Sequence, residues 1–235
     1  MKRKKGVKIF FAAVAGLLLL ALLLVAVMFL RQWFISRKIN DDYTAVLQNP
    51  AYQTPVSVSG IPTLAQEISC GYAILEMLAD WQGKGITEQT LFADNKGAVT
   101  TAMGTGFLDE ISKQFPEWEI ARHINLTNSE LLQTVYETLA AGMPVPIEFA
   151  ALRDTGSGKV WTLHFAVVVG MDLQKDVVFV QNPYGYEETY SVNEFLRATR
   201  YDSYEDMELF FRFGFAFGLF HKNTVYTIQN KASGS

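Results

Sequence analysis

The pattern of apolar positions begins with one uninterrupted run, from Ile9 to Leu30. As a helix these 22 residues would span about 33 Å, and the hydrocarbon core of a bilayer is about 30 Å thick. The competing interpretation is a secretory signal peptide, whose apolar region has about 7–15 residues and ends in small residues. Here the run is longer and ends in bulky residues, with Trp33 just beyond it. We therefore expect a retained transmembrane helix over residues 9–30.

Basic residues flank this run unequally. Five Lys or Arg residues precede it within residues 1–8, and three follow it within residues 31–38. Lys and Arg are enriched on the cytoplasmic side of membrane helices, and they also contact anionic lipid there. The pattern predicts a cytoplasmic N-terminus over residues 1–8 and an extracytoplasmic domain, held at the cell membrane by a single pass.

Beyond the run, the pattern predicts a stalk and then one folded domain. Residues 31–55 have mixed polarity, no sustained period and two prolines, which is typical of a linker. Residues 56–230 alternate between segments of helical and of strand periodicity. A chain of 235 residues can hold one domain of this size.

Within the domain, helical patterns come first and strand patterns later. Four early segments have apolar residues at helical spacing or helix-capping residues: 70–81, 87–95, 106–115 and 129–142, the last capped by Thr127 or Asn128. Three later segments have the alternating or continuous apolar pattern of strands: 144–152, 161–172 and 176–183. A short helix at 191–199 and closing strands at 214–220 and 223–229 follow. This order predicts an α+β domain with an antiparallel sheet.

The aromatic segment Leu209 to Phe220 has two interpretations. Its alternation of aromatic residues with glycine and alanine favours a strand of the core, which is what we expect. The alternative is an exposed apolar patch that meets a membrane or a partner.

Composition and charge narrow the classes of function. Apolar residues make up 49% of the chain and aromatic residues 13%, which excludes a disordered protein. Residues 1–38 hold eight basic and no acidic residues, so residues 39–235 hold twelve basic and 24 acidic residues, a formal net charge of −12. An acidic domain repels nucleic acid, and we expect no nucleic-acid partner.

Metal and cofactor motifs are weak. His123 and His221 have no neighbouring Cys or acidic cluster at metal-ligand spacing, so we expect no metal site. The glycine-containing segments at 103–110 and 154–160 lack residues that dinucleotide-binding and phosphate-binding loops require. We therefore expect no cofactor.

Cys70, the single cysteine of the chain, is the main candidate for chemistry. It stands at the start of the helix expected over residues 70–81, where the positive end of the helix dipole lowers the pKa of a thiol. A free cysteine is more often a small buried apolar residue. A catalytic thiol also needs a base and a group that orients the base.

His164 and Asn182 are the candidate partners of this thiol. His164 interrupts an otherwise apolar face of its strand, where a buried structural histidine is the alternative. The short turn after this strand predicts a hairpin, and folding the two strands together places His164 opposite residues 182–184. Directly opposed residues have Cβ atoms about 4.5–5.5 Å apart, so Asn182 can bond one imidazole nitrogen and leave the other for Cys70. The Asn-Pro pair is also typical of a turn, and both roles can hold.

Gln66 is the fourth candidate, four residues before the cysteine. A glutamine amide in this place can donate a hydrogen bond to a developing oxyanion, together with the backbone N–H of Cys70. A single glutamine does not by itself indicate an oxyanion hole. The assignment of Gln66 to this role therefore depends on Cys70, His164 and Asn182 forming a site.

The chain resembles the peptidase C39-like group of papain-like cysteine peptidases over residues 56–196. The resemblance lies in four segments: the glutamine with CGYAILEMLADWQGKGITEQTLFADN, then LAAGMPVPI, then HFAVVVGMD with VVFVQNPYG, and finally YSVNEFL. The most specific parts are Cys-Gly at a helix start and the H-F-x-V-V-x-G strand followed by N-P-x-G.

The resemblance implies a papain-like fold, with a helical N-terminal part that begins at the cysteine and a C-terminal antiparallel sheet. It also implies roles for four residues: Cys70 as nucleophile, His164 as base, Asn182 as orienting group and Gln66 in the oxyanion hole. Two features depart from the family pattern. Gln66 lies four residues before Cys70 where many members have six, and the orienting residue is Asn rather than the Asp of bacteriocin-processing members. There is no nucleotide-binding cassette, so a transporter-coupled role is not implied.

The sequence therefore predicts a membrane-anchored, extracytoplasmic cysteine peptidase that hydrolyses peptide or protein substrates. Two alternatives stay open. One is a catalytically inactive C39-like domain that binds peptides. The other is an acyltransferase or amidase that forms the same thioester and uses a different acceptor or substrate.

Overall fold

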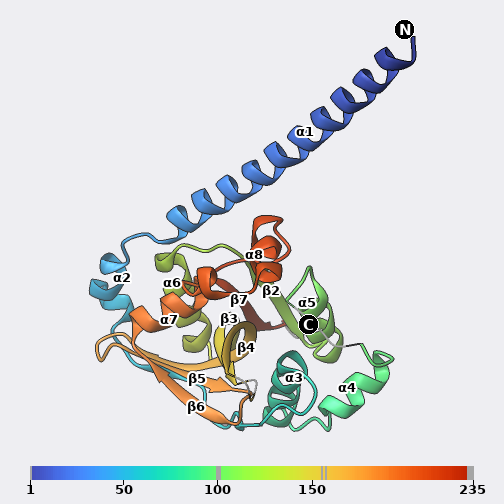
Figure 1. Ribbon diagram of the computed structural model, residues 1–235. Helices are drawn as coiled ribbons and strands as arrows, with labels where there is room; N and C mark the ends of the chain where they lie inside the picture. Colours follow the sequence, from blue (N-terminus) through green and yellow to red (C-terminus); the bar gives the residue numbers. More distant parts are fainter. Residues whose placement is uncertain (1, 99–101, 155, 157, 232–235) are drawn as a thin grey trace.

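Figure 1 shows the protein as a computed structural model, which describes residues 2–98, 102–154, 156 and 158–231. The centre of the domain is a seven-stranded sheet in which the described strand pairs are antiparallel. In spatial order its main path is β2 (Trp118–His123), β7 (Thr224–Asn230), β3 (Val145–Asp154), β4 (Lys159–Asp172), β5 (Val177–Asn182) and β6 (Tyr186–Tyr190). The short β1 (Val56–Ser57) pairs with β4. This confirms the predicted α+β domain.

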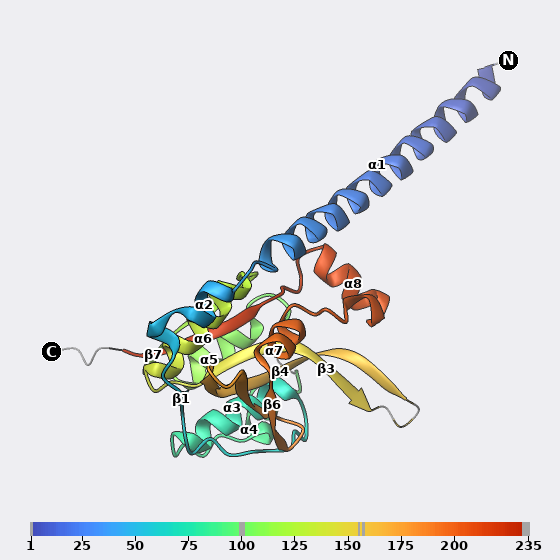
Figure 2. The ribbon, with the colours of Figure 1, turned by 90° about the vertical axis from the view of Figure 1, so that its left-hand side faces the viewer.

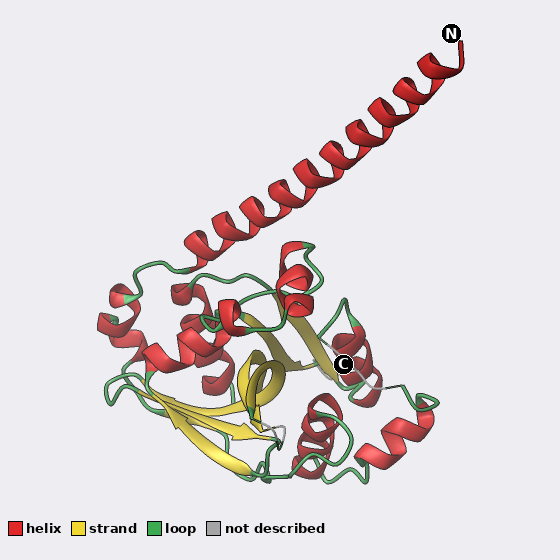
Figure 3. Cartoon of the chain, in the orientation of Figure 1, coloured by secondary structure: helices red, strands yellow, loops and turns green. Residues whose placement is uncertain are grey.

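Helices cover both faces of the sheet (Figure 2 and Figure 3). One face packs against α3 (Cys70–Trp81) and α5 (Gly106–Gln114), with α4 (Glu88–Asp94) beside α3. The other face packs against α6 (Asn128–Ala140) and α7 (Val192–Thr199). The remaining helical elements are α1 (Lys2–Ile39), α2 (Thr44–Gln48), η1 (Pro50–Tyr52), η2 (Tyr204–Asp206) and α8 (Leu209–Ala216).

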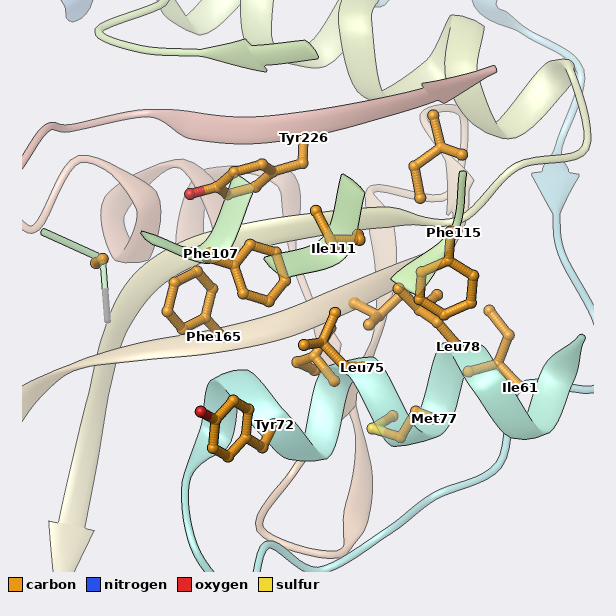
Figure 4. Close-up of a cluster of buried hydrophobic side chains, with 14 of the residues drawn as sticks. Ile61, Tyr72, Leu75, Met77, Leu78, Phe107, Ile111, Phe115, Phe165 and Tyr226 are labelled. Carbon is orange, nitrogen blue, oxygen red and sulfur yellow. The ribbon is translucent and has the colours of Figure 1, made fainter. Parts of the chain in front are cut away.

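Strand β4 is apolar on both sides because both of its faces are covered. Successive residues of a strand point to opposite faces. Phe165 and Val167 accordingly join the cluster beneath α3 and α5, whereas Ala166 and Val168 join the cluster beneath α6 and α7. Figure 4 shows the first cluster, in which side chains of α3 lie opposite side chains of α5 and the sheet: Tyr72, Leu75, Met77, Leu78, Phe107, Ile111, Phe115, Phe165 and Tyr226.

Side-chain caps define the starts of α3, α4, α6 and α7. The Ser69 hydroxyl accepts a hydrogen bond from the N–H of Tyr72 at the start of α3 (3.3 Å). Thr127 forms a capping box with Glu130 at α6, and Ser191 forms one with an acidic residue of α7. Helices α3 to α7 and strands β3, β4, β5 and β7 therefore lie where the sequence predicts them.

Three strands, β1, β2 and β6, are not among the predicted ones. Strand β1 has only two residues. Strands β2 and β6 lie at edges of the sheet and mix apolar with polar or charged residues, Trp118 to His123 and Tyr186 to Tyr190. An edge strand buries little of its surface, so its sequence need not alternate clearly.

The prediction of a core strand at 214–220 is wrong. Residues Leu209–Ala216 form helix α8, and Phe217 caps its C-terminal end. Phe211 and Phe215 are four residues apart, so they satisfy a helical period as well as strand alternation. Phe215 enters the core, while several other aromatic side chains of the segment remain exposed.

Residues 31–55 differ from the expected stalk. Helix α1 continues to Ile39, and α2 follows after a short turn. Val46 of α2 is buried, and the hydroxyl of Tyr136 on α6 donates a hydrogen bond to the carbonyl of Thr54 (2.8 Å). Residues 31–39 are thus the end of α1, and residues 40–54 pack along α6 instead of forming an extended linker.

Helix α1 projects away from the domain in both views (Figure 1 and Figure 2). Among the described residues, one helix is long and apolar enough to cross a membrane, and it is this one. Its apolar section has a mean hydropathy of 3.0. The same length and composition also suit a signal sequence.

Leu75 tests the packing between α3 and the sheet. Its side chain is completely buried in the first cluster. We expect Leu75→Ala to lower the free energy of unfolding by about 2–5 kcal/mol, through lost burial and the cavity it leaves. Denaturant unfolding of the detergent-solubilised chain, followed by near-ultraviolet circular dichroism, measures the change. Asp80→Ala, at an exposed position of the same helix, should change it by less than about 0.5 kcal/mol; equal effects would refute this packing.

Candidate active site

Cys70 is the first residue of α3, directly after the Ser69 cap. Its side chain is partly buried and lies against β4, where the backbone N–H of Phe165 points at the thiol. The backbone N–H groups of Gly71 and of Cys70 itself also face the sulfur. The thiol therefore sits between a helix N-terminus and the residue that follows His164.

The state of this thiol differs from the sequence expectation. Burial raises the pKa of Cys70 above its ordinary value, and the nearby Glu88 carboxylate acts in the same direction. The surrounding N–H groups lower the pKa, as a helix N-terminus should, but by less. The net direction favours the protonated thiol over the thiolate.

His164 meets Asn182 across the β4–β5 hairpin, as the sequence predicts. The Nε2 atom of His164 lies 2.9 Å from Oδ1 of Asn182, and both side chains are buried. The strands are in register at Val167 and Gln181, consistent with the predicted pairing. Tyr184 stacks on the imidazole, with ring centroids 4.2 Å apart.

The orientation of the Asn182 amide follows from its other partners. Its Oδ1 atom also accepts a hydrogen bond from the N–H of Tyr184 (2.9 Å), and its Nδ2 atom donates to Glu188 Oε2 (2.8 Å). The same carboxylate oxygen accepts a hydrogen bond from the hydroxyl of Tyr190 (2.6 Å). Because Oδ1 is an acceptor, Nε2 of His164 must be the donor. In the neutral ring, Nδ1 is then unprotonated and can accept a proton.

Burial lowers the pKa of His164 to about 4, and the hydrogen bond to Asn182 opposes this shift only in part. Burial is the first cause of both shifts, raising the pKa of Cys70 and lowering that of His164, so it favours the uncharged forms of the thiol and the imidazole.

Gln66 lies beside the turn that follows Asn182. Its backbone N–H donates to the carbonyl of Pro183 (2.7 Å), and Ala65 forms an isolated bridge with Tyr184. Its side-chain Oε1 is buried and has no hydrogen-bond partner among the described residues. The loop before α3 is thereby tied to the turn that carries Asn182.

The close approach of this loop explains the glycine of the N-P-x-G segment. Gly185 has φ +93°, a conformation that favours glycine. A Cβ atom there would lie 3.1 Å from Cβ of Ala65. Both the turn and the contact therefore require Gly185.

Glu88 is an unpredicted residue that holds the same loop. Its buried carboxylate accepts hydrogen bonds from three consecutive N–H groups: those of Glu67 (2.8 Å), Ile68 (2.9 Å) and Ser69 (2.9 Å). These groups lie between Gln66 and Cys70. The carboxylate therefore fixes the chain that separates the two candidate residues.

A cleft of about 610 Å³ opens beside Asn182 and Tyr184. Aromatic side chains contribute much of its wall: Trp161, Tyr184, Tyr186 and Tyr190. Apolar residues of β3 and polar or charged residues of β4, β6, α7 and the segment 202–206 line the rest, whereas Cys70 and His164 are not among the lining residues. A cleft of this size and composition can accept a peptide side chain.

The described residues contain no group of three or more His, Cys, Asp and Glu side chains that could hold a metal ion. His123 instead lies on β2, with Nε2 2.9 Å from the hydroxyl of Thr227. His221 lies near Asn125 (3.4 Å). Neither histidine belongs to the cluster around Cys70.

The buried His164 should make the domain sensitive to acid. Its folded pKa of about 4 lies below the value of about 6.5 for an exposed histidine. The unfolded chain therefore binds the extra proton first, and stability is lost as the pH falls from about 6.5 toward 4, by an amount on the order of 3 kcal/mol. We expect His164→Gln to remove this part of the pH dependence and His123→Gln to keep it. Thermal unfolding between pH 4 and 7.5 measures the difference; parallel curves for wild type and His164→Gln would contradict it.

Comparison with known proteins confirms the family resemblance. The model of the peptidase C39-like family matches residues 58–208, which is more than half of the chain. No curated protein matches the sequence. The matched segment contains Cys70, His164, Asn182 and Gln66, together with Glu88 and Glu188. The chain belongs to the peptidase C39-like family.

Proposed function

We propose that this protein is a cysteine peptidase that hydrolyses peptide bonds with a Cys70–His164–Asn182 triad. The observation that carries the proposal is the fixed imidazole: Asn182 holds Nε2 of His164 at 2.9 Å and leaves Nδ1 free to act as a base. The thiol of Cys70, at the N-terminus of α3, lies against Phe165, the residue that follows His164 on β4. Membership of the C39-like family supports the same reaction class.

The proposed reaction starts from the neutral pair. As the sulfur of Cys70 attacks the substrate carbonyl, Nδ1 of His164 takes the thiol proton. The oxyanion accepts hydrogen bonds from the backbone N–H of Cys70 and from the amide of Gln66. The imidazolium then gives its proton to the leaving amine, the C–N bond breaks, and a thioester remains. Water, deprotonated by His164, hydrolyses this thioester and restores the thiol.

The location of the reaction follows from α1 in this proposal. We take α1 as a retained membrane helix, with the basic residues 2–8 in the cytoplasm. The domain then acts on peptides or proteins outside the cytoplasm. The cleft beside Asn182 and Tyr184 would receive a more distant part of the substrate, because neither Cys70 nor His164 is among its lining residues.

A second candidate function is peptide binding without cleavage. The observation that favours it is the direction of the two pKa shifts, raised for Cys70 and lowered for His164. This pair is not poised as thiolate and imidazolium, which is the usual state of an activated cysteine. In that case the cleft would still bind a peptide, but substitution of His164 would leave function intact.

Peptide cleavage by the full-length chain in detergent micelles separates the two candidates. We expect Cys70→Ala to abolish cleavage of a peptide library, and His164→Ala to lower kcat by about 10³-fold or more because the base is lost. His123→Ala is the matched control and should retain activity. Binding of library peptides by wild type and Cys70→Ala, with no cleavage by either, would instead establish the binding function.

Glu188 is proposed as a positioning residue, since it touches Asn182 and not the reacting atoms. We expect Glu188→Ala to lower kcat about tenfold, equivalent to about 1.4 kcal/mol, with little change in KM, because the Asn182 amide loses its anchor. Glu188→Gln keeps an acceptor and should restore most of the activity. Glu187→Ala removes a carboxylate from the same strand, one that bonds Gln181 instead, and should leave kcat unchanged. If Glu188→Ala raises KM and leaves kcat unchanged, Glu188 does not act by positioning Asn182.

A further inference from the structure

Helix α8 exposes an apolar surface that the proposed peptidase reaction does not use. Five large apolar side chains of α8 and the turn after it are between 41% and 66% exposed; we call them the α8 patch: Leu209, Phe210, Phe213, Phe217 and Leu219. Their neighbours Phe215 and Phe220 are buried and hold the segment to the core. Several large apolar side chains exposed on one short segment mark a site of contact with a partner or a membrane.

The α8 patch lies at the base of α1. The ring of Phe213 packs edge-on against Phe29, with centroids 5.6 Å apart. The guanidinium of Arg31 lies against Gly218, at the C-terminal end of α8. Figure 1 and Figure 2 agree that α8 is on the side of the domain from which α1 leaves. The patch therefore continues the apolar surface of α1 onto the domain.

The position of Phe29 sets the depth of the patch. It is the next-to-last residue of the uninterrupted apolar run, which ends at Leu30. Arg31 and Trp33 follow, and such residues mark the boundary between hydrocarbon and headgroups. A side chain that touches Phe29 lies at this boundary whenever α1 spans the bilayer.

We propose that the α8 patch inserts into the interfacial region of the same bilayer that holds α1. This inference rests on the retained anchor of the proposed function, and it adds a second membrane contact, made by the domain itself. Short amphipathic helices that carry Phe and Leu on one face bind in this way, with the apolar side chains at the level of the acyl-chain boundary.

The charges around the patch indicate which lipids it needs. Glu205, Asp206 and Glu208 precede or begin α8 and are exposed, whereas the basic Arg212 lies on α8 and Arg31 lies beside Gly218. Charges of both signs therefore surround the patch, and neither sign of headgroup is favoured throughout. The apolar side chains supply the contact, and it should form in a zwitterionic bilayer without anionic lipid.

Depth-dependent quenching in nanodiscs tests this contact with the full-length chain. In a Cys70→Ala background, one new cysteine carries an environment-sensitive fluorophore, and the phosphatidylcholine bilayer contains lipids spin-labelled near the headgroup or deep in the acyl chain. We expect a probe at Phe210→Cys to be quenched by the shallow label. A probe at Ala93→Cys, at an exposed position of α4, should not be quenched. A probe at Leu20→Cys, in the middle of the apolar run, should be quenched by the deep label.

Each result decides a separate point. Quenching at Leu20→Cys without quenching at Phe210→Cys overturns the docking and leaves the anchor standing. Loss of quenching at both positions overturns the anchor and the docking together. A blue-shifted but unquenched probe at Phe210→Cys, with two chains per disc, assigns the patch to a second copy and also overturns the proposal. Phe217→Cys repeats the measurement, and unfolding temperatures confirm that each labelled chain is folded.

Discussion

The pairing of β4 with β5 ends at Val167 and Gln181, and the arrangement of the candidate site depends on where this pairing ends. Upstream of Val167, the described part of β4 pairs with β3 but no longer with β5. The backbone N–H of Phe165 is thereby available to the thiol at the start of α3, and the chain after β5 turns away at Asn182. Because β4 and β5 separate at this point, the edge of β4 is free to contact the N-terminus of α3. The same separation places the amide of Asn182 beside the imidazole of His164.

The same packing sets the chemistry of the thiol and the imidazole. A helix N-terminus favours a thiolate, but the buried environment removes water from both groups and favours their neutral forms. Glu88 adds to this, because the carboxylate that fixes the loop before Cys70 also opposes a negative sulfur. Precise placement of the loop and easy ionisation of the thiol are therefore in conflict. In the proposed reaction, proton transfer during attack on the substrate would remove the need for a charge pair at rest.

The sequence predicts those parts of the site that depend on local pattern. The short turn of the β4–β5 hairpin is enough to place Asn182 near His164, and the capping residue is enough to place Cys70 at the start of α3. Glu88 and Glu188 could not be found in this way, because each acts on backbone or amide groups that only the tertiary fold brings within reach. Helix α8 was missed for a different reason: its aromatic residues fit two periods, and tertiary packing of Phe215 selected the helical one.

The packed segment between α1 and the domain has a consequence for substrate access. Residues 40–54 pack along α6 through Val46 and the Tyr136–Thr54 hydrogen bond, so the chain between α1 and the domain is held in place. A bilayer that holds α1 and receives the α8 patch would contact the domain at two places and fix its tilt. The cleft beside Asn182 would then open at one height and in one direction relative to the membrane. Substrates would be selected by where they present an extended segment, before any side chain is recognised.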